Sequence, residues 1–413
     1  MSHQNLETSD VTELKHCVAC GSSNLKLTLD LGSQPLANSY KLNKEDIQTE
    51  YPLAINRCEE CYHVQLTHSV NPELMFNDYL YVSGTSKTMH SHMKEFADFA
   101  SRTTDGKKFV LDVGCNDGTQ LDYFADLGYL TFGVDPAKNL HSVSTAKGHT
   151  VFCDWFDNKF AKQIVRSGVK FDLVTAQNVF AHGPNPLEFL LAAKDVLNDE
   201  GTIIIQTSQA NMIKNNEFDT IYHEHISFFN INSMNELCKR AGLFLVAVDY
   251  MPIHGTSFIF VIKKKFDGRT VDLLIKEEAA QGMYLPETYI RYAENCNKLV
   301  KELKASVDFF RQAIMGWNVV GYGAAAKGMT LLNYSKLHLD YIVDDNSLKQ
   351  GRFTPGSSIP ILSADELDKS KDATLFVPLA WNFFDEIREK IVNRRKNPFD
   401  RFITYFPKVE IRE

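Results

Sequence analysis

Short runs of apolar residues recur through the middle of the chain, and each run ends in glycine or polar residues. The runs lie at residues 109–113, 132–135, 151–154, 171–177 and 201–206. A short apolar run bounded by turn residues is typical of a strand that is covered on both faces in a parallel sheet. Further strand-like runs at 244–248 and 257–262 complete the sheet. The pattern therefore predicts an open α/β sheet.

A second series of strand-like runs follows a long charged stretch. Residues 267–315 have a helical and highly charged pattern, and new runs begin at Asn318, Tyr341 and Leu375. A chain of 413 residues is too long for one ordinary core. We therefore expect two or three domains, of which the last is again Rossmann-like.

The composition limits the classes of partner. Apolar residues make up 44% and charged residues 23% of the chain, which is typical of a globular protein. The net charge of -8, without a long Lys/Arg cluster, argues against nucleic acid but allows a basic pocket for one diphosphate. No apolar run reaches the roughly 20 residues of a membrane span, and the N-terminus lacks the pattern of a secretory signal. We expect a cytoplasmic protein without a membrane partner.

Four of the eight cysteines form two CxxC pairs, Cys17 with Cys20 and Cys58 with Cys61. Two such pairs are typical of knuckles that present four thiolates to a zinc ion. Redox chemistry and coincidence are the alternatives, although a redox CxxC normally stands alone at a helix start. Because four thiolates leave no open position for water, the predicted zinc is structural.

The first glycine turn predicts a cofactor site. The turn contains Asp112, Gly114, Asn116, Asp117 and Gly118. The predicted site also includes Asp135, which ends the next strand, and Asp154 and Trp155, at the end of the third strand. Asp135 is placed to accept the two ribose hydroxyls of a nucleotide-like ligand. Asp117 stands where a pyrophosphate would lie, so a cationic sulfonium cofactor, S-adenosylmethionine (SAM), is favoured over NAD. A glycine turn without a cofactor is the alternative.

The densest group of proton-handling side chains is Tyr222-His223-Glu224-His225, which follows the fifth strand. Imidazole titrates nearest neutral pH, and a carboxylate and a phenol can orient it, so the cluster is suited to removing a proton from carbon. Asn178 and His182 follow the fourth strand, at the same edge of the predicted sheet, and should meet the cluster in one cleft. Satisfied polar residues or a metal site are the alternatives.

Two further segments are candidates for substrate contact. Tyr81 lies in a turn that leads into an amphipathic helix and could reach a substrate, although packing is the alternative. In the second glycine turn, Gly323 to Lys327, the basic residue replaces the acidic one of the first turn and suits a diphosphate. Trp381 and Asn382 end a neighbouring strand. Plain helix packing, or an NAD role, would also explain this turn.

Taken together, the two CxxC pairs, Asp-Val-Gly-Cys-Asn-Asp-Gly, Asn178 with His182, Asp-Thr-Ile-Tyr-His-Glu-His and Gly-Tyr-Gly-Ala-Ala-Ala-Lys-Gly resemble the SAM-dependent C-methyltransferases of nucleotide-linked deoxysugars. The resemblance covers nearly the whole chain. It implies a zinc-binding domain at 1–76, a Rossmann-like SAM methyltransferase domain at 77–265 and a Rossmann-like domain at 266–413 that holds the nucleotide sugar.

The resemblance also implies roles for single residues. His225 would abstract the proton beside the ketone of a 4-keto-6-deoxy nucleotide sugar, so that C3 is methylated. The pocket around the sugar would be lined by Tyr222, Glu224, His182, Asn178 and Tyr81. The chain departs from the family at His254-Gly255-Thr256-Ser257, where the family pattern is His-Gly-Gly-Ser followed by a basic residue, which leaves the identity of the sugar open. Methylation of oxygen or nitrogen, and a non-catalytic binding protein, are the rival functions.

Overall fold

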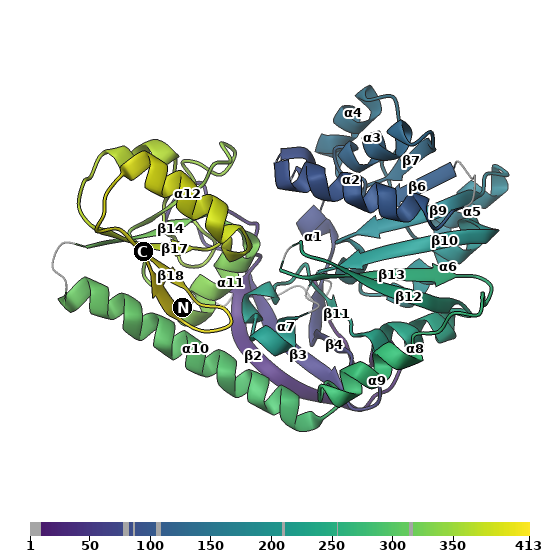
Figure 1. Cartoon of the computed structure of the whole chain (residues 1–413), viewed down its shortest axis with the longest axis horizontal. Coiled ribbons are helices and arrows are strands. Elements are labelled where there is room, and N and C mark those ends of the chain that lie inside the picture. Colours follow the sequence, from purple (N-terminus) through teal and green to yellow (C-terminus); the bar gives the residue numbers. More distant parts are fainter. Residues whose placement is uncertain are drawn as a thin grey trace.

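The structure of the chain is a computed structural model. It describes residues 10–76, 82–85, 87–104, 109–208, 211–253, 255–313 and 317–413. Two α/β lobes are joined by a long curved ribbon of strands, β2 and β3, and by one long helix, α10 (Figure 1). The predicted α/β fold is confirmed.

The first lobe is built on a seven-stranded sheet with the order β12-β13-β10-β9-β6-β7-β8. The strands from β6 to β10 are parallel, and β13 runs antiparallel to both of its neighbours. Every apolar run that the sequence marks in this region overlaps one of these strands. Their bounds are β6 Phe109–Val113, β7 Leu130–Val134, β8 Thr150–Phe152, β9 Phe171–Gln177, β10 Leu197–Thr207, β12 Phe244–Met251 and β13 Ser257–Lys263.

Helices cover both faces of this sheet. One face packs against α2 and α3 through Phe96 and Phe124, and the other packs against α5, α6 and α8 through Phe160, Leu190 and Leu237. The helices are α2 Lys87–Ser101, α3 Thr119–Asp126, α4 Lys138–Ala146, α5 Asn158–Arg166, α6 Pro186–Val196 and α8 Ile231–Ala241. Because both faces are apolar, the ligand site of such a sheet lies at an edge.

That edge is fixed by the strand order. After β6 the chain adds β7 and β8 on one side, and after β9 it adds β10 on the other side. A crevice forms at the carboxyl ends of the strands where the order reverses. The Gly114 turn follows β6 and Asn178 follows β9, so both lie at this switch point.

The N-terminal part forms two small antiparallel sheets. One has the order β11-β4-β3-β2, and the other pairs β1 with β5. Strand β11 comes from the middle of the chain, directly after His225, and pairs with β4. The bounds are β1 Val11–Glu13, β2 Leu25–Pro35, β3 Glu50–Cys58, β4 Val64–Leu66, β5 His68–Val70, β11 Ser227–Phe228 and α1 Glu73–Phe76.

The second lobe has a six-stranded sheet with the order β16-β15-β14-β17-β18-β19, in which only β19 is antiparallel to its neighbour among the described pairs. Its switch point lies between β14 and β17. The bounds are β14 Asn318–Tyr322, β15 Tyr341–Val343, β16 Ile361–Leu362, β17 Thr374–Pro378, β18 Arg401–Thr404, β19 Glu410–Arg412, α10 Pro286–Ala313, α11 Ala326–Ser335 and α12 Phe384–Arg395. Helix α9 (Asp272–Ala280), which precedes α10, packs against the core of the first lobe beside α8 (Figure 1).

One core is shared between the ribbon and the second lobe. Leu29 and Leu53 of the ribbon belong to the same buried cluster as Phe218, Tyr289 and Leu331. Burial of apolar area is the main stabilising term in folding, so this shared cluster fixes the ribbon against both α10 and α11. The segment between β10 and β11 is held in the same cluster. Among the described residues, no helix combines the length and apolarity that crossing a membrane requires.

Candidate active site

The proposed base, His225, is buried and has both ring nitrogens bonded. Its Nδ1 lies 2.8 Å from the carbonyl oxygen of Thr220, and its Nε2 lies 2.7 Å from the Tyr222 hydroxyl. A carbonyl can only accept, so Nδ1 carries the proton and Nε2 is the basic nitrogen. The loop around His225 therefore selects the tautomer that can take a proton at Nε2.

Two more predicted residues surround this imidazole. The His182 ring stacks on the His225 ring at 5.2 Å, and the Tyr222 ring lies at 3.9 Å. Burial lowers the pKa of His182 to about 4, so His182 is neutral near pH 7 and has an N–H to donate. The predicted meeting of the fourth-strand and fifth-strand residues is confirmed for His182 and His225.

Glu224 is held by the N-terminal part of the chain. Its Oε1 accepts a hydrogen bond of 2.5 Å from the Asn38 side chain. Burial acts to lower the pKa of Lys349, but the nearby Tyr40, Asp344 and Glu224 favour its charged form and outweigh the effect of burial. The pKa of Lys349 is therefore raised, in part by Glu224. Asn38, Tyr40 and Lys349 carried no motif, so sequence reasoning missed them.

His223 contacts β3. Its Nε2 donates to the backbone carbonyl of Tyr51 at 3.2 Å, and its ring meets the Tyr51 ring edge-on at 5.9 Å. Burial lowers the pKa of His223 to about 4. These contacts join the base loop, the segment from Phe218 to Ile226 that carries His225, to β3.

Asn178 has a left-handed backbone, with φ of 54°, directly after β9. Its side-chain oxygen is buried and has no hydrogen-bond partner among the described residues. A buried polar atom without a partner calls for a ligand or water. Tyr81, predicted to reach the substrate, and His254 lie outside the described residues.

The first glycine turn has the features of a cofactor cradle. Gly114 and Gly118 have φ of 72° and 77°, and a Cβ on Gly114 would lie 2.3 Å from the Val179 side chain. Asp112, Asp135 and Asp117 all act electrostatically on Cys115, in the middle of the turn. Burial raises the pKa of Asp112 to about 7. This concentration of carboxylates fits a cationic ligand and disfavours a pyrophosphate.

The carboxylate of Asp135 shapes the turn as well. Its Oδ2 accepts from the backbone N–H of Asn116 and its Oδ1 from that of Ala137, both at 2.9 Å. Each oxygen has a second lone pair, so two ribose hydroxyls can still be accepted.

A short segment before α2 covers the turn. The backbone N–H groups of Ser83 and Gly84 donate to the side chains of Asn116 and Asp117, at 3.0 and 3.1 Å. A Cβ on Gly84 would lie 2.5 Å from the Thr119 hydroxyl. Sequence reasoning missed this contact.

Asp154 and Trp155 follow β8. Trp155 meets Phe76 edge-on at 6.2 Å, and Phe76 in turn stacks on His182 at 5.6 Å. Trp155 therefore reaches the base pocket through one intervening ring. Asp154 makes a local hydrogen bond with the N–H of Trp155.

The four cysteines of the CxxC pairs come together. Their sulfur atoms all lie within 4.8 Å of one another, with Cys17 and Cys61 3.6 Å apart and Cys20 and Cys58 3.5 Å apart. A tetrahedral zinc ion with Zn–S bonds of about 2.3 Å needs sulfur separations of about 3.8 Å, so the donor set fits. Arg240 of α8 donates a hydrogen bond to the carbonyl of Ala19, which fixes the first CxxC pair to the first lobe.

The second glycine turn faces the base loop. The Lys327 ammonium lies 4.9 Å from the centre of the Trp381 ring, and the Trp381 indole N–H donates to Asp219 at 2.8 Å. Gly323 has φ of 82°. Asn382 follows Trp381 in a short 3-10 helix, η5 (Trp381–Phe383). The predicted residues Gly323, Lys327 and Trp381 thus gather at the second switch point.

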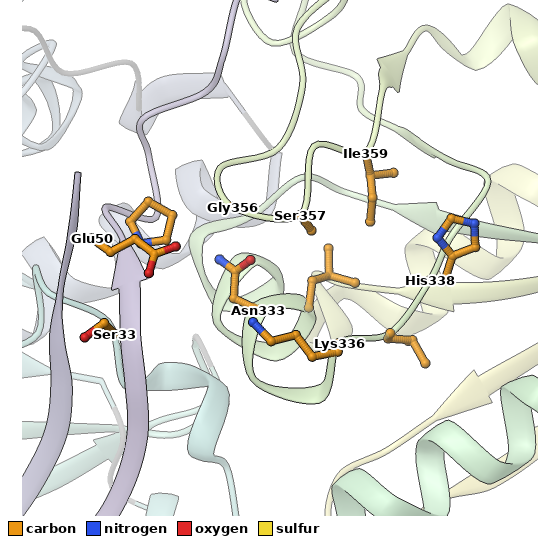
Figure 2. Close-up of a pocket in the computed structure, with 11 residues that line it drawn as sticks. Ser33, Glu50, Asn333, Lys336, His338, Gly356, Ser357 and Ile359 are labelled. Carbon is orange, nitrogen blue, oxygen red and sulfur yellow. The ribbon is translucent and has the colours of Figure 1, made fainter. Parts of the chain in front are cut away.

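A separate hollow of about 270 Å³ opens between the ribbon and the end of α11 (Figure 2). Its polar lining comes from both sides, with Ser33 and Glu50 on the ribbon and Asn333, Lys336 and His338 on the second lobe. It contains no predicted site residue.

Three family models match the chain in succession. They are a zinc binding domain over residues 17–76, a methyltransferase domain over 86–248 and a C-methyltransferase C-terminal domain over 252–407. Together with the cradle and the cysteine cluster, they define the class. The protein is a SAM-dependent methyltransferase with a structural zinc ion.

A full-length relative narrows the class. The C-methyltransferase NovU of Streptomyces niveus is 30% identical over 415 residues, which cover 97% of each chain. The chain belongs to this C-methyltransferase family. A ubiquinone biosynthesis O-methyltransferase of Glaesserella parasuis is 32% identical over only 25% of this chain and 45% of its own. Among solved structures, the plantazolicin methyltransferase BpumL aligns with 43% of this chain and 86% of its own, at 14% identity and a TM-score of 0.36.

Proposed function

We propose that the protein methylates C3 of a 4-keto-6-deoxy nucleotide-diphosphate sugar, with His225 as the base. The observation that carries the proposal is the state of the imidazole. Thr220 fixes the proton on Nδ1, and the Tyr222 hydroxyl marks the direction in which Nε2 accepts. A general base needs a free lone pair that points at the proton it removes, which this arrangement provides. Methyl transfer to a hydroxyl oxygen involves no removal of a proton from carbon.

A sugar carbon becomes a nucleophile only after it loses a proton. A neighbouring ketone makes this loss feasible, because the electron pair of the broken C–H bond forms a C=C bond and the ketone oxygen becomes an oxyanion. Nε2 of His225 takes the proton. Bound SAM would supply an electrophilic methyl group, and the C–S bond electrons would stay with sulfur. The electron pair of the enolate C=C bond would form the new bond from C3 to this methyl group, and the oxyanion would return to a ketone.

The developing oxyanion needs hydrogen-bond donors. Tyr222 and neutral His182 both lie against His225, and a preorganised donor is worth roughly 2.7 to 4 kcal/mol in such a site. In the structure the Tyr222 hydroxyl bonds to Nε2. We propose that it turns to the substrate oxygen when the carbon acid occupies the place in front of Nε2.

We propose further that the nucleotide lies at the second switch point, within the domain at 266–413, close to Gly323, Lys327, Trp381 and Asn382. Burial raises the pKa of Glu217 and of Asp219, and the nearby Lys327 ammonium only partly offsets that rise. Lys327 would supply a positive charge beside the diphosphate. The sugar would extend from there toward His225.

The test is solvent exchange at carbon. The protein is incubated in deuterium oxide with thymidine diphosphate 4-keto-6-deoxyglucose, and NMR follows the proton at C3. We expect exchange in the wild type and its loss in His225→Ala, with a gain of one methyl group on C3 when SAM is added. Methylation without exchange, or a His225→Ala variant of wild-type activity, would instead favour methylation of oxygen or nitrogen.

A further inference from the structure

Trp381 lies at the edge of the second sheet and touches the loop that carries the base. It follows β17, and its neighbour Ala380 lies against the second glycine turn, where a Cβ on Gly323 would come within 3.0 Å of the alanine methyl. From this position the indole N–H donates to Asp219 Oδ2 at 2.8 Å. One side chain thus bridges the proposed nucleotide edge and the base loop.

The indole is held in one orientation. Lys327 lies over its face at 4.9 Å, and Phe406 meets it edge-on at 5.4 Å. On the side of the first lobe, a Cβ on Gly255 would lie 3.3 Å from the outer ring carbon of Trp381. A tryptophan packed from three sides presents its N–H in a fixed direction.

Asp219 is fully buried in the 3-10 helix η3 (Phe218–Thr220). The next residue, Thr220, supplies the carbonyl that accepts from His225 Nδ1. On the other side of Thr220, the carbonyl of Ile221 accepts a hydrogen bond of 2.9 Å from the Thr330 hydroxyl of α11. The peptide unit that fixes the tautomer of the base is therefore flanked by two hydrogen bonds from the second lobe.

We infer that Trp381 and Asp219 are positioning residues, which make the alignment of His225 depend on the second lobe. The inference rests on the proposed function of His225 as base. If η3 turns, Nδ1 loses its acceptor, and the neutral imidazole can place its proton on Nε2, where it can no longer accept one. A nucleotide at the second switch point touches the same indole, so its binding and the readiness of the base are coupled.

The first test uses the ligand-free protein. The histidine rings are labelled with ¹⁵N, and the His225 signal is assigned by its absence in His225→Gln. We expect the Nδ1–H form in the wild type and a mixture of both tautomers in Trp381→Phe, which keeps a ring but loses the N–H. Asp219→Asn should retain the Nδ1–H form, because its amide oxygen still accepts from the indole. Trp317→Phe, a tryptophan of the same lobe whose ring meets Phe310, is the matched control.

The second test measures function. Trp381→Phe should lower the exchange rate at C3 of thymidine diphosphate 4-keto-6-deoxyglucose at least tenfold, while calorimetry finds SAM affinity within twofold of the wild type. Asp219→Asn should exchange several-fold faster than Asp219→Leu. A purely structural role would lower thermal stability and SAM affinity together, and that outcome would overturn the inference.

The two proposals fail in different ways. If Trp381→Phe keeps both the wild-type tautomer and the wild-type exchange rate while His225→Ala abolishes exchange, the positioning role is wrong and the base stands. If His225→Ala exchanges at the wild-type rate, the base assignment is wrong, and the positioning role falls with it.

Discussion

The side-chain amide of Asn38 donates a hydrogen bond of 2.5 Å to Glu224, across 186 positions of the sequence. Asn38 lies in the connection between β2 and β3, and Glu224 is next to the proposed base. The zinc-bearing part of the chain therefore contributes a side chain beside the proposed base as well as a metal site.

Removal of this donor should weaken catalysis. Glu224 is only 4% exposed, and in Asn38→Ala its carboxylate loses a charge-assisted hydrogen bond, which is typically worth about 1.5 to 3 kcal/mol. We expect kcat/KM to fall roughly 10- to 100-fold. The control is Asn43→Ala, an exposed residue whose side chain bonds only to Asp46 among the described residues. Equal rates for both variants would contradict the role of Asn38.

Tyr222→Phe should act on the chemical step. The variant keeps the ring against His225 but loses the hydroxyl that lies 2.7 Å from Nε2. We expect kcat to fall about 100-fold or more, with little change in SAM binding, because the lost donor acts on the transition state. Single-turnover methylation measures the effect. Tyr334→Phe, which removes a surface hydrogen bond to Asn297, is the control. A change of less than threefold in kcat would show that the phenol has no part in the reaction.

Zinc removal should disturb the site at a distance. The four cysteines anchor β3 and the loop before β4, and β3 carries the Tyr51 carbonyl that holds His223. We expect one zinc per chain by elemental analysis, and we expect Cys58→Ser to lose zinc, melt at lower temperature and methylate more slowly. Exposed Cys153 provides the control variant Cys153→Ser. Unchanged melting after complete chelation would mean that zinc does not support the fold.

The pH dependence of stability should contain a contribution from His223. Its pKa is about 4 in the folded state, against 6.5 without burial, so above pH 6.5 it is neutral in both states and contributes nothing. As the pH falls from 6.5 to 4, the unfolded chain binds a proton that the folded chain does not. The free energy of unfolding then falls by up to about 1.4 kcal/mol per pH unit.

His223→Gln removes this contribution and keeps an N–H for the Tyr51 carbonyl. In urea titrations between pH 7 and 4, we therefore expect the free energy of unfolding to decline less steeply in the variant than in the wild type. Parallel slopes would contradict the shifted pKa of His223.

The sequence predicts what depends on local order. Apolar runs predicted the strands, CxxC spacing predicted the cysteine cluster, and the turn after β6 predicted the cradle, because each signal lies within a few adjacent residues. The contact between Tyr222 and His225 spans only three positions, so it could also be predicted from the sequence.

Contacts between distant segments gave no such signal. The sequence predicts that Trp381 contacts the substrate. Asp219, which accepts its indole hydrogen bond, lies 162 positions away in the chain and carries no signal of this contact. Asn38 and Lys349 stand in segments without a motif, and their places follow from the core that the ribbon shares with the second lobe. Only tertiary packing brings them to the base loop.

The two hydrogen bonds that the second lobe gives to Asp219 of η3 and to Ile221, directly after it, have a consequence during synthesis on the ribosome. The SAM cradle is complete once β13 has emerged, but the donors from Thr330 and Trp381 belong to the last part of the chain to be made. A nascent or truncated chain can therefore assemble a cofactor site before the support of its base exists. Such a chain would hold SAM without taking a proton from carbon.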